Sequence, residues 1–305
     1  MSAIDTPKPT ATPPSLPLRL LRSPVGRIAA FAITAWLIGI VCHRIYDGLG
    51  LPHGEIPFGE VTPLIELFRL LPIVLAYWLL VRTIENRRVE ELALRRLVPY
   101  ALAGLIGGFI LFSLVVGALW ALGAYVVHGT NPDIPWLGLI LVLGVGAGVG
   151  EEIISRGVLF RIVEEGLGTW ISLLLSAGFF GFMHIWNPNA TTWSALAIAL
   201  EAGLLFGLLY HVTRSLWLCM GVHAAWNVAQ GPFYGIPVSG FEQKGWLAST
   251  MQGPNWLTGG EFGAEASVVA LGICSTLTAV LLAIAIRRGS LVAPFWARPK
   301  AKPGA

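Results

Sequence analysis

Chemically reactive side chains stand at helical spacing inside apolar stretches of the sequence. Glu151, Glu152 and Arg156 occur in one such stretch, and His223 and Asn227 occur in another. Residues four positions apart share a face of a helix, so Glu152 can pair with Arg156, and His223 lies beside Asn227. An ionisable group inside a membrane costs about 2.5–3.5 kcal/mol on insertion scales, so each of these residues needs a partner or a function.

A third apolar stretch carries His184, which can reach the level of Glu151. The two residues lie about 16 positions on either side of a turn near residues 165–168. At 1.5 Å per residue, an antiparallel helical hairpin places both side chains roughly 25 Å from that turn. His223 reaches the same level from its own helix if the hairpin protrudes beyond the membrane surface. We therefore predict that these three side chains meet.

This combination suits the hydrolysis of a peptide bond. A carboxylate in a water-poor site can take a proton from water, and a neighbouring imidazole can assist it. The side chains of His223 and Asn227 can donate hydrogen bonds to the oxyanion that forms, which contributes about 3 kcal/mol. Ser155 lies beside these residues, but neither a GxSxG turn nor a Ser-His-Asp pattern surrounds it. A serine nucleophile is therefore disfavoured.

Two other hypotheses use the same residues. Glu151, His184 and His223 could bind Zn in a zinc-dependent intramembrane metalloprotease. The sequence has no HExxH motif, and we favour a reaction without a metal or another cofactor. Alternatively, a membrane transporter or a non-catalytic scaffold could use the buried Glu, His and Arg side chains as a proton or ion path.

The composition places these residues in a membrane protein. Of the 305 residues, 55% are apolar and only 12% are charged, with a mean hydropathy of +0.72. A typical soluble domain carries about 25% charged residues, so a disordered chain and an ordinary soluble enzyme are excluded. The net charge of +3 gives no reason to expect a nucleic acid partner. The three cysteines lie in apolar stretches without CxxC spacing, which indicates small buried side chains.

Eight apolar segments are long enough to cross a membrane as helices. The expected fold class is therefore all-α, a polytopic membrane protein with a bundle of about eight transmembrane helices. We expect these helices at about 28–41, 64–81, 100–127, 136–163, 168–186, 193–211, 215–231 and 265–286. A β-barrel is disfavoured because the apolar runs are continuous and do not alternate with polar residues.

The distribution of positive charge predicts the orientation of the bundle. All but four of the 20 Lys and Arg residues fall on one side of the expected helices, the four being Arg44, Arg69, Arg156 and Lys244. Basic residues collect on the cytosolic side of membrane proteins. We therefore expect a multi-pass protein of the cell (inner) membrane with both termini in the cytosol.

Three motifs occur in order on successive apolar segments: Glu151-Glu152-x-x-x-Arg156, Phe180-x-x-x-His184 and His223-x-x-x-Asn227. Together they resemble the CPBP family of intramembrane proteases, which includes the type II CAAX prenyl endopeptidases and many bacterial relatives. The resemblance covers about residues 136–232. The stretches around His223 (GVHAAWN), at 237–240 (PVSG) and at 258–260 (TGG) are similar to bacterial members.

The resemblance implies an intramembrane endopeptidase in which Glu151 and His184 activate a water molecule. It also implies that His223 and Asn227 stabilise the oxyanion, while Glu152 and Arg156 hold the helix face with Phe180 in support. The implied substrate is a membrane-tethered protein or peptide in the lipid bilayer, either of the prenylated CAAX type or another lipid-proximal one. A role in bacteriocin immunity, also associated with this family, is a third hypothesis. Glu201, in the sixth expected helix, lies outside the motifs and either lines the substrate cavity or bonds a neighbouring helix.

We divide the chain into five parts on this basis. They are a disordered cytosolic tail (1–27), three helices with a basic cytosolic connector (28–127), a catalytic core (136–232), an ordered outside loop with the last helix (233–288), and a second cytosolic tail (289–305). The glycines and aromatic residues of the 33-residue loop after the seventh helix predict an ordered cap or a re-entrant segment, because structureless loops of that length are uncommon.

Overall fold

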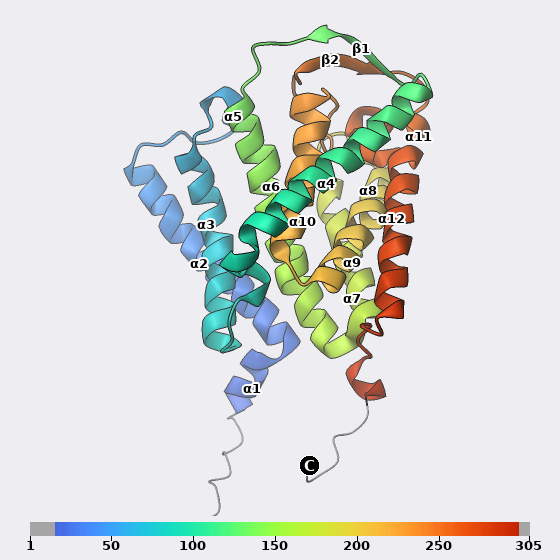
Figure 1. Ribbon diagram of the computed structural model, residues 1–305. Helices are drawn as coiled ribbons and strands as arrows, with labels where there is room; N and C mark the ends of the chain where they lie inside the picture. Colours follow the sequence, from blue (N-terminus) through green and yellow to red (C-terminus); the bar gives the residue numbers. More distant parts are fainter. Residues whose placement is uncertain (1–15, 299–305) are drawn as a thin grey trace, which may run out of the picture.

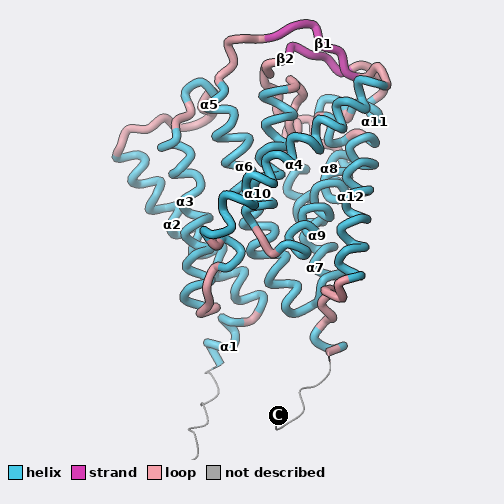
Figure 2. The backbone as a smooth tube through the Cα atoms, viewed as in Figure 1, coloured by secondary structure: helices cyan, strands magenta, loops and turns pink. Residues whose placement is uncertain are grey.

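The protein is a bundle of long helices with one small sheet at one end (Figures 1 and 2). The computed structural model describes residues 16–298. Within that range, six helices are long and apolar enough to cross a membrane, namely Pro24–Gly48, Pro63–Ile84, Leu94–Ala121, Trp136–Trp186, Thr192–Thr213 and Val268–Arg287. The predicted all-α polytopic membrane fold is confirmed. The expected number of about eight spans stays a prediction.

The α-helices and strands follow one another along the chain with short π-helical and 3₁₀ segments between them. The helices are α1 (Leu16–Arg22), α2 (Pro24–Gly48), α3 (Pro63–Leu79), α4 (Leu94–Ala121), α5 (Trp136–Leu139), α6 (Ala147–Glu152), α7 (Arg161–Met183), α8 (Thr192–Ile198), α9 (Leu204–Thr213), α10 (Leu216–Val228), α11 (Asn255–Thr258) and α12 (Val268–Arg287). The strands are β1 (Tyr125–Thr130) and β2 (Leu247–Met251). We call the end of the bundle that carries the strands the sheet end, and the end that carries α1 the terminal end (Figure 1).

The helical run Trp136–Trp186 contains two of the expected segments, 136–163 and 168–186. They are separated at Gly168, where φ is +83° and the backbone is not helical. A side chain there would be strained, and its Cβ would lie 2.6 Å from the carbonyl oxygen of Val292. The chain therefore reverses close to the turn expected near residues 165–168. This hairpin carries Glu151 on its first arm and His184 at the end of its second.

Helix α10 packs closely against α4 because small residues face each other. A Cβ at Gly104 would lie 2.5 Å from the carbonyl oxygen of Leu218, and a Cβ at Gly108 would lie 2.3 Å from that of Val222. Either contact is far too short, so the two helix backbones could not approach this closely with larger residues. The contact fixes the part of α10 that carries His223.

At the sheet end, the structure corrects one expected boundary. Helix α4 ends at Ala121, six residues before the expected limit of 127, and Gly123 follows with φ of +72°. Residues 125–130 then form β1, which pairs antiparallel with β2 in the register Tyr125 to Met251. β-branched and aromatic residues in this segment (YVVHGT) suit a strand better than a helix. The loop 232–264 contains β2, α11 and 3₁₀ turns.

At the terminal end, residues expected to belong to a disordered tail form helices. Helix α1 covers Leu16–Arg22, and α2 begins at Pro24 after Ser23, whose side chain accepts a hydrogen bond from the backbone nitrogen of Gly26. A capping serine followed by proline is a strong start for a helix. Residues 1–15 of that expected tail, and residues 299–305 of the second one, lie outside the described range.

Candidate active site

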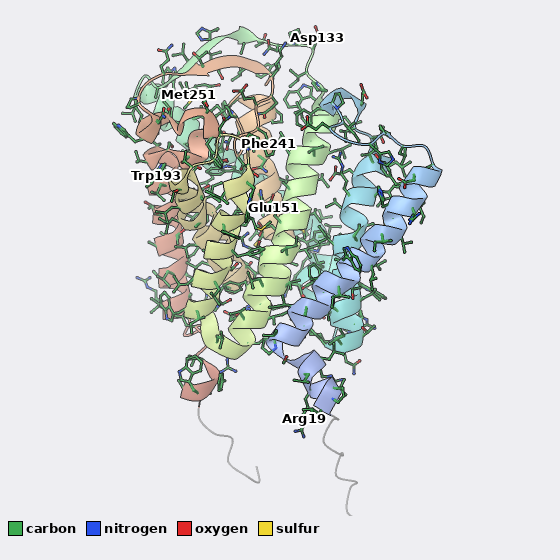
Figure 3. The ribbon with its side chains drawn as sticks, turned by 180° about the vertical axis from the view of Figure 1, so that it is seen from behind. Arg19, Asp133, Glu151, Trp193, Phe241 and Met251 are labelled. Carbon is green, nitrogen blue, oxygen red and sulfur yellow. The ribbon has the colours of Figure 1, made fainter. Side chains whose placement is uncertain are left out.

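Glu151 and His184 lie next to each other inside the bundle. The Oε2 atom of Glu151 on α6 is 3.9 Å from the Nε2 atom of His184, which follows α7. Glu151 lies midway along the bundle, between Arg19 at the terminal end and Asp133 at the sheet end (Figure 3). Two polar groups at this distance can bind one water molecule between them. The predicted meeting of these two residues is therefore seen in the structure.

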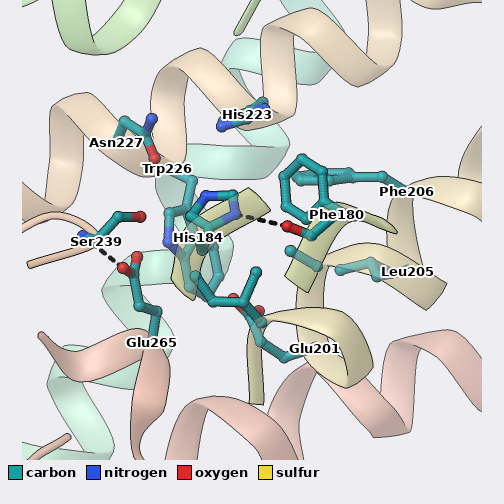
Figure 4. A pocket seen from close by; sticks show the side chains of 12 residues that line it. Phe180, His184, Glu201, Leu205, Phe206, His223, Trp226, Asn227, Ser239 and Glu265 are labelled. Atoms are coloured by element: carbon teal, nitrogen blue, oxygen red, sulfur yellow. Dashed lines mark hydrogen bonds between the residues drawn. The ribbon is translucent and has the colours of Figure 1, made fainter. Parts of the chain in front are cut away.

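The orientation of His184 is fixed by its own helix. Its Nδ1 atom donates a hydrogen bond of 2.7 Å to the carbonyl oxygen of Phe180, drawn as a dashed line in Figure 4. A carbonyl oxygen only accepts, so Nδ1 carries the proton and Nε2 is the atom that faces Glu151. The Phe180 ring packs against the imidazole at a centroid distance of 4.8 Å. The four-residue spacing thus sets the tautomer and the direction of the ring.

Glu152 is fully buried and binds two partners. Its Oε1 atom accepts a hydrogen bond of 2.9 Å from Arg156 and another of 3.0 Å from Nδ1 of His223. The predicted pairing of Glu152 with Arg156 is confirmed, whereas the bond to His223 on α10 was not predicted. Because Nδ1 of His223 is held by the carboxylate, Nε2 is the ring nitrogen left for a ligand.

Arg156 has no exposed surface, and its environment compensates the buried charge. Besides Glu152, its guanidinium donates hydrogen bonds of 3.0 and 3.2 Å to the carbonyl oxygens of Ala202 and Gly203. It also lies over the rings of Phe180 and Phe206, 4.5 and 5.1 Å from their centroids. Cations bind favourably to aromatic faces, especially where water is excluded. Arg156 therefore ties the α6 face to the neighbouring helices.

Asn227 lies one turn beyond His223, and both side chains line one cavity, which is described below. Its Nδ2 atom donates a hydrogen bond of 2.9 Å to the carbonyl oxygen of Leu143, in the π-helical segment Ile140–Gly146. An amide nitrogen carries two hydrogens, so one N–H remains for another acceptor. Asn227 thus joins two helices and can still donate a hydrogen bond.

These side chains line a cavity of about 400 Å³, which we call the main cavity. Glu151, His184, His223 and Asn227 all contribute to it. The opposite wall comes from α3 and contains Glu66, Arg69, Leu70 and Ile73. A side cavity of about 180 Å³, lined by Glu151, Ser155, Phe180 and Met183 among others, meets it at Glu151 and His184.

Behind His184 and His223 lies an inner cavity that contains two more carboxyl groups, those of Glu201 and Glu265 (Figure 4). The space open to the centre of a water molecule is about 20 Å³, enough for one water. Neither glutamate forms an ion pair with any residue in 16–298. Glu201 lines this inner cavity and not the main cavity, and its role stays a prediction.

Glu265 was missed by the sequence analysis. It lies on the 3₁₀ turn Ala264–Ala266, and its Oε1 atom accepts a hydrogen bond from the backbone nitrogen of Ser239. Burial raises the pKa of Glu265 to about 7, against the opposing effect of that hydrogen bond. The sequence offered only a weak signal, an acid between small residues just before the last apolar segment.

Four π-helical segments surround the site: Ile140–Gly146, Ile153–Phe160, Ala199–Gly203 and Ala229–Phe233. A π-helical turn bonds residue i to i+5, so carbonyl groups become available for side chains, and such turns are frequent at functional sites. The carbonyl groups that bind Asn227 and Arg156 belong to two of these segments. Hydrophobic periodicity does not reveal them.

The site residues do not form a set of close metal ligands. In residues 16–298, one group of three or more His, Cys, Asp and Glu residues has ligand atoms all within 4.8 Å of one another, and it lies elsewhere, at His43, Asp47 and His53. The ligand atoms of Glu151, His184 and His223 are therefore not all within 4.8 Å of one another in this arrangement, and the zinc alternative stays a prediction.

Fold and site together define a polytopic helical membrane protein with a carboxylate–histidine cluster beside an internal cavity. Residues 131–229 match the family described as type II CAAX prenyl endopeptidase Rce1-like. The predicted resemblance is confirmed, and the matched segment contains all of the motif residues from Glu151 to Asn227. Curated proteins gave no match. The family supports a CAAX-type intramembrane endopeptidase in general.

Proposed function

We propose that the protein hydrolyses a peptide bond of a membrane-associated protein by means of a water molecule held between Glu151 and His184. The observation that carries the proposal is the 3.9 Å separation of Oε2 and Nε2 inside a cavity. Glu151 takes a proton from the water while the water oxygen attacks the carbonyl carbon of the substrate. The tetrahedral intermediate then collapses, the C–N bond breaks, and the proton passes to the departing amine.

The negative charge of the intermediate needs donors on the other side of the substrate carbonyl. Nε2 of protonated His223 and the second N–H of Asn227 supply them, because both side chains line the main cavity. The carboxylate of Glu152 supports this role, since it accepts the Nδ1 hydrogen of His223 and favours the protonated ring. Arg156 in turn compensates the charge of Glu152.

The wall formed by α3 favours a substrate with a free C-terminal carboxylate close to the scissile bond. Arg69 is partly exposed in the main cavity, and its distance of 3.6 Å from Glu66 leaves it without a short hydrogen bond to that carboxylate. A guanidinium is well suited to bind a carboxylate through a bidentate pair of hydrogen bonds. A CAAX-type substrate is processed at its C-terminus and carries such a group.

We also propose that the protein lies in the cell membrane with both termini in the cytosol. Arg87 and Arg88 between α3 and α4, together with Arg95 and Arg96 in the first turn of α4, support this orientation. Substrates would then enter the main cavity from the membrane or its cytosolic surface.

The test uses the purified full chain in lipid vesicles with a membrane-tethered, prenylated CAAX-type peptide. We expect cleavage by the wild type and by Ser155→Ala, and none by Glu151→Gln or His184→Ala. Cleavage at the wild-type rate by either of the last two folded variants would refute the assignment. Proton or ion flux through the vesicles without cleavage would favour a transporter instead. Activity that survives exhaustive chelation supports the metal-independent reaction, and loss that zinc restores would contradict it.

A further inference from the structure

A second cluster of chemically active side chains lies outside both the matched family segment and the candidate active site. His43 and Asp47 stand four residues apart in the last turns of α2, and His53 follows on the loop toward α3. We propose that these three residues bind a divalent transition metal ion of the zinc type at the sheet end of α2.

The distances between the ligand atoms suit such an ion. Oδ1 of Asp47 is 3.2 Å from Nε2 of His53, and Oδ2 of Asp47 is 3.7 Å from Nε2 of His43. One ligand atom from each residue lies within 4.8 Å of the other two. Tetrahedral ligands about 2.0–2.1 Å from zinc stand roughly 3.4 Å from one another. Small movements of the side chains are enough to admit the ion.

The loop that brings His53 back to α2 is held in place by other contacts. The hydroxyl of Tyr46 donates a hydrogen bond of 2.6 Å to the carbonyl oxygen of Pro52. The Tyr46 ring also packs edge-on against His53 and against Phe68 of α3, with centroid distances of 5.4 and 5.7 Å. The ligands are therefore positioned largely in advance, which lowers the entropic cost of binding.

The type of ligands points to a particular class of metal. Imidazole nitrogens favour zinc, copper and nickel, whereas magnesium and calcium prefer oxygen ligands alone. The side chains of His43, Asp47 and His53 are 65%, 43% and 56% exposed, so an ion can enter from solvent and retain bound water. A cavity of about 340 Å³ between α2 and α3 adjoins the cluster and is lined by His43, His53 and Arg69.

This ion would connect the end of α2 to the loop that leads toward α3. Arg69 lines both the cavity beside the cluster and the main cavity. An ion bound by α2 and by the following loop would restrain the segment that leads into the α3 wall. Because a ligand that binds only the folded protein stabilises it, zinc should raise the melting temperature.

The experiment measures binding of the metal alone to the purified, metal-free full chain in detergent. Zinc is titrated by calorimetry and Co²⁺ by its visible absorption, which reports tetrahedral coordination. We expect one saturable site in the wild type. His53→Ala and Asp47→Asn should weaken binding at least tenfold, with melting temperatures of the metal-free proteins unchanged because the side chains are exposed.

Two control variants make the result specific. His128→Ala removes an exposed histidine of β1 at the same end and should bind zinc as the wild type does. His184→Ala removes a histidine of the active site and should also retain the metal. Absence of saturable binding, undiminished binding by His53→Ala, or loss of binding in His184→Ala would each overturn the proposal. None of these results depends on proteolytic activity, so the proposed function is tested separately.

Discussion

Glu152 and His223 are joined by a hydrogen bond of 3.0 Å between a carboxylate oxygen and Nδ1, although they lie 71 residues apart on α6 and α10. The neighbouring Glu151 faces the cavity instead. Two consecutive glutamates thus have different surroundings, because successive residues point about 100° apart around a helix. One carboxylate is enclosed by Arg156 and His223, and the other is 39% exposed beside His184. This difference allows their contributions to be separated by mutation.

For Glu151→Gln, we expect loss of activity without loss of stability. The side chain forms no hydrogen bond with any residue in 16–298, and its partner His184 stands 3.9 Å away. An amide cannot take the proton of the water. Cleavage of the tethered peptide should fall by at least about a thousandfold, which corresponds to roughly 4 kcal/mol in the barrier. The melting temperature should remain within about 2 °C of the wild type, and a larger fall would indicate a structural role.

Arg156→Ala should instead lower the stability of the folded protein. It leaves the buried carboxylate of Glu152 without its cationic partner, which typically costs about 3–5 kcal/mol. A lower denaturant midpoint in detergent is the expected result. The double variant Glu152→Gln with Arg156→Met removes both charges and should recover much of the stability but not the activity. An unchanged midpoint for Arg156→Ala would contradict the importance of this ion pair.

Because of the buried carboxyl of Glu265, we expect the stability of the protein to decrease as the pH rises. Its pKa in the folded protein is raised to about 7 from an ordinary value of 4.5, so the folded state holds a proton that the unfolded state has lost. The free energy of unfolding therefore decreases between about pH 4.5 and 7, by on the order of 3 kcal/mol in total, and this contribution is constant at higher pH. Glu265→Gln should remove this component of the decrease and raise the melting temperature at pH 8.

The neighbouring acid Glu261 is a matched control for that measurement, because it is exposed on the preceding 3₁₀ turn. Glu261→Gln should keep the pH dependence of the wild type. If Glu265→Gln and wild type have parallel stability curves between pH 5 and 8, the carboxyl does not titrate in this range.

Arg69→Gln should discriminate between substrates by their C-termini. Loss of a charge-assisted hydrogen bond costs about 1.5–3 kcal/mol, so kcat/KM should fall about tenfold to a hundredfold for a peptide with a free carboxylate. A peptide amidated at its C-terminus should be cleaved equally by both proteins. Arg44→Gln, an exposed arginine on α2, serves as the control. An equal loss for both peptides would show that Arg69 does not bind the carboxylate.

The parts of the site that sequence could predict are those set by local spacing. Four-residue intervals predicted the pair Glu152–Arg156, and counting from the turn near 165–168 predicted that Glu151 meets His184. The bonds from His223 to Glu152 and from Asn227 to Leu143 join separate helices. Their partners depend on helix rotation, which the π-helical segments alter.

The same reasoning explains which elements were predicted. Long apolar runs predicted the helices because a membrane requires about 20 such residues. The strand pair β1–β2 and the turn carrying Glu265 lie beyond these runs, where pairing between distant segments decides the structure. The His43, Asp47 and His53 cluster depends on the path of a loop, and its spacing matches no common motif.

The reacting groups come from one stretch of about 80 residues, but the wall that faces them comes from α3, earlier in the chain. On the proposed function, chemistry and selectivity are encoded in separate parts of the sequence. Substitutions in α3 would then refit the chamber to another peptide and leave Glu151 and His184 in place.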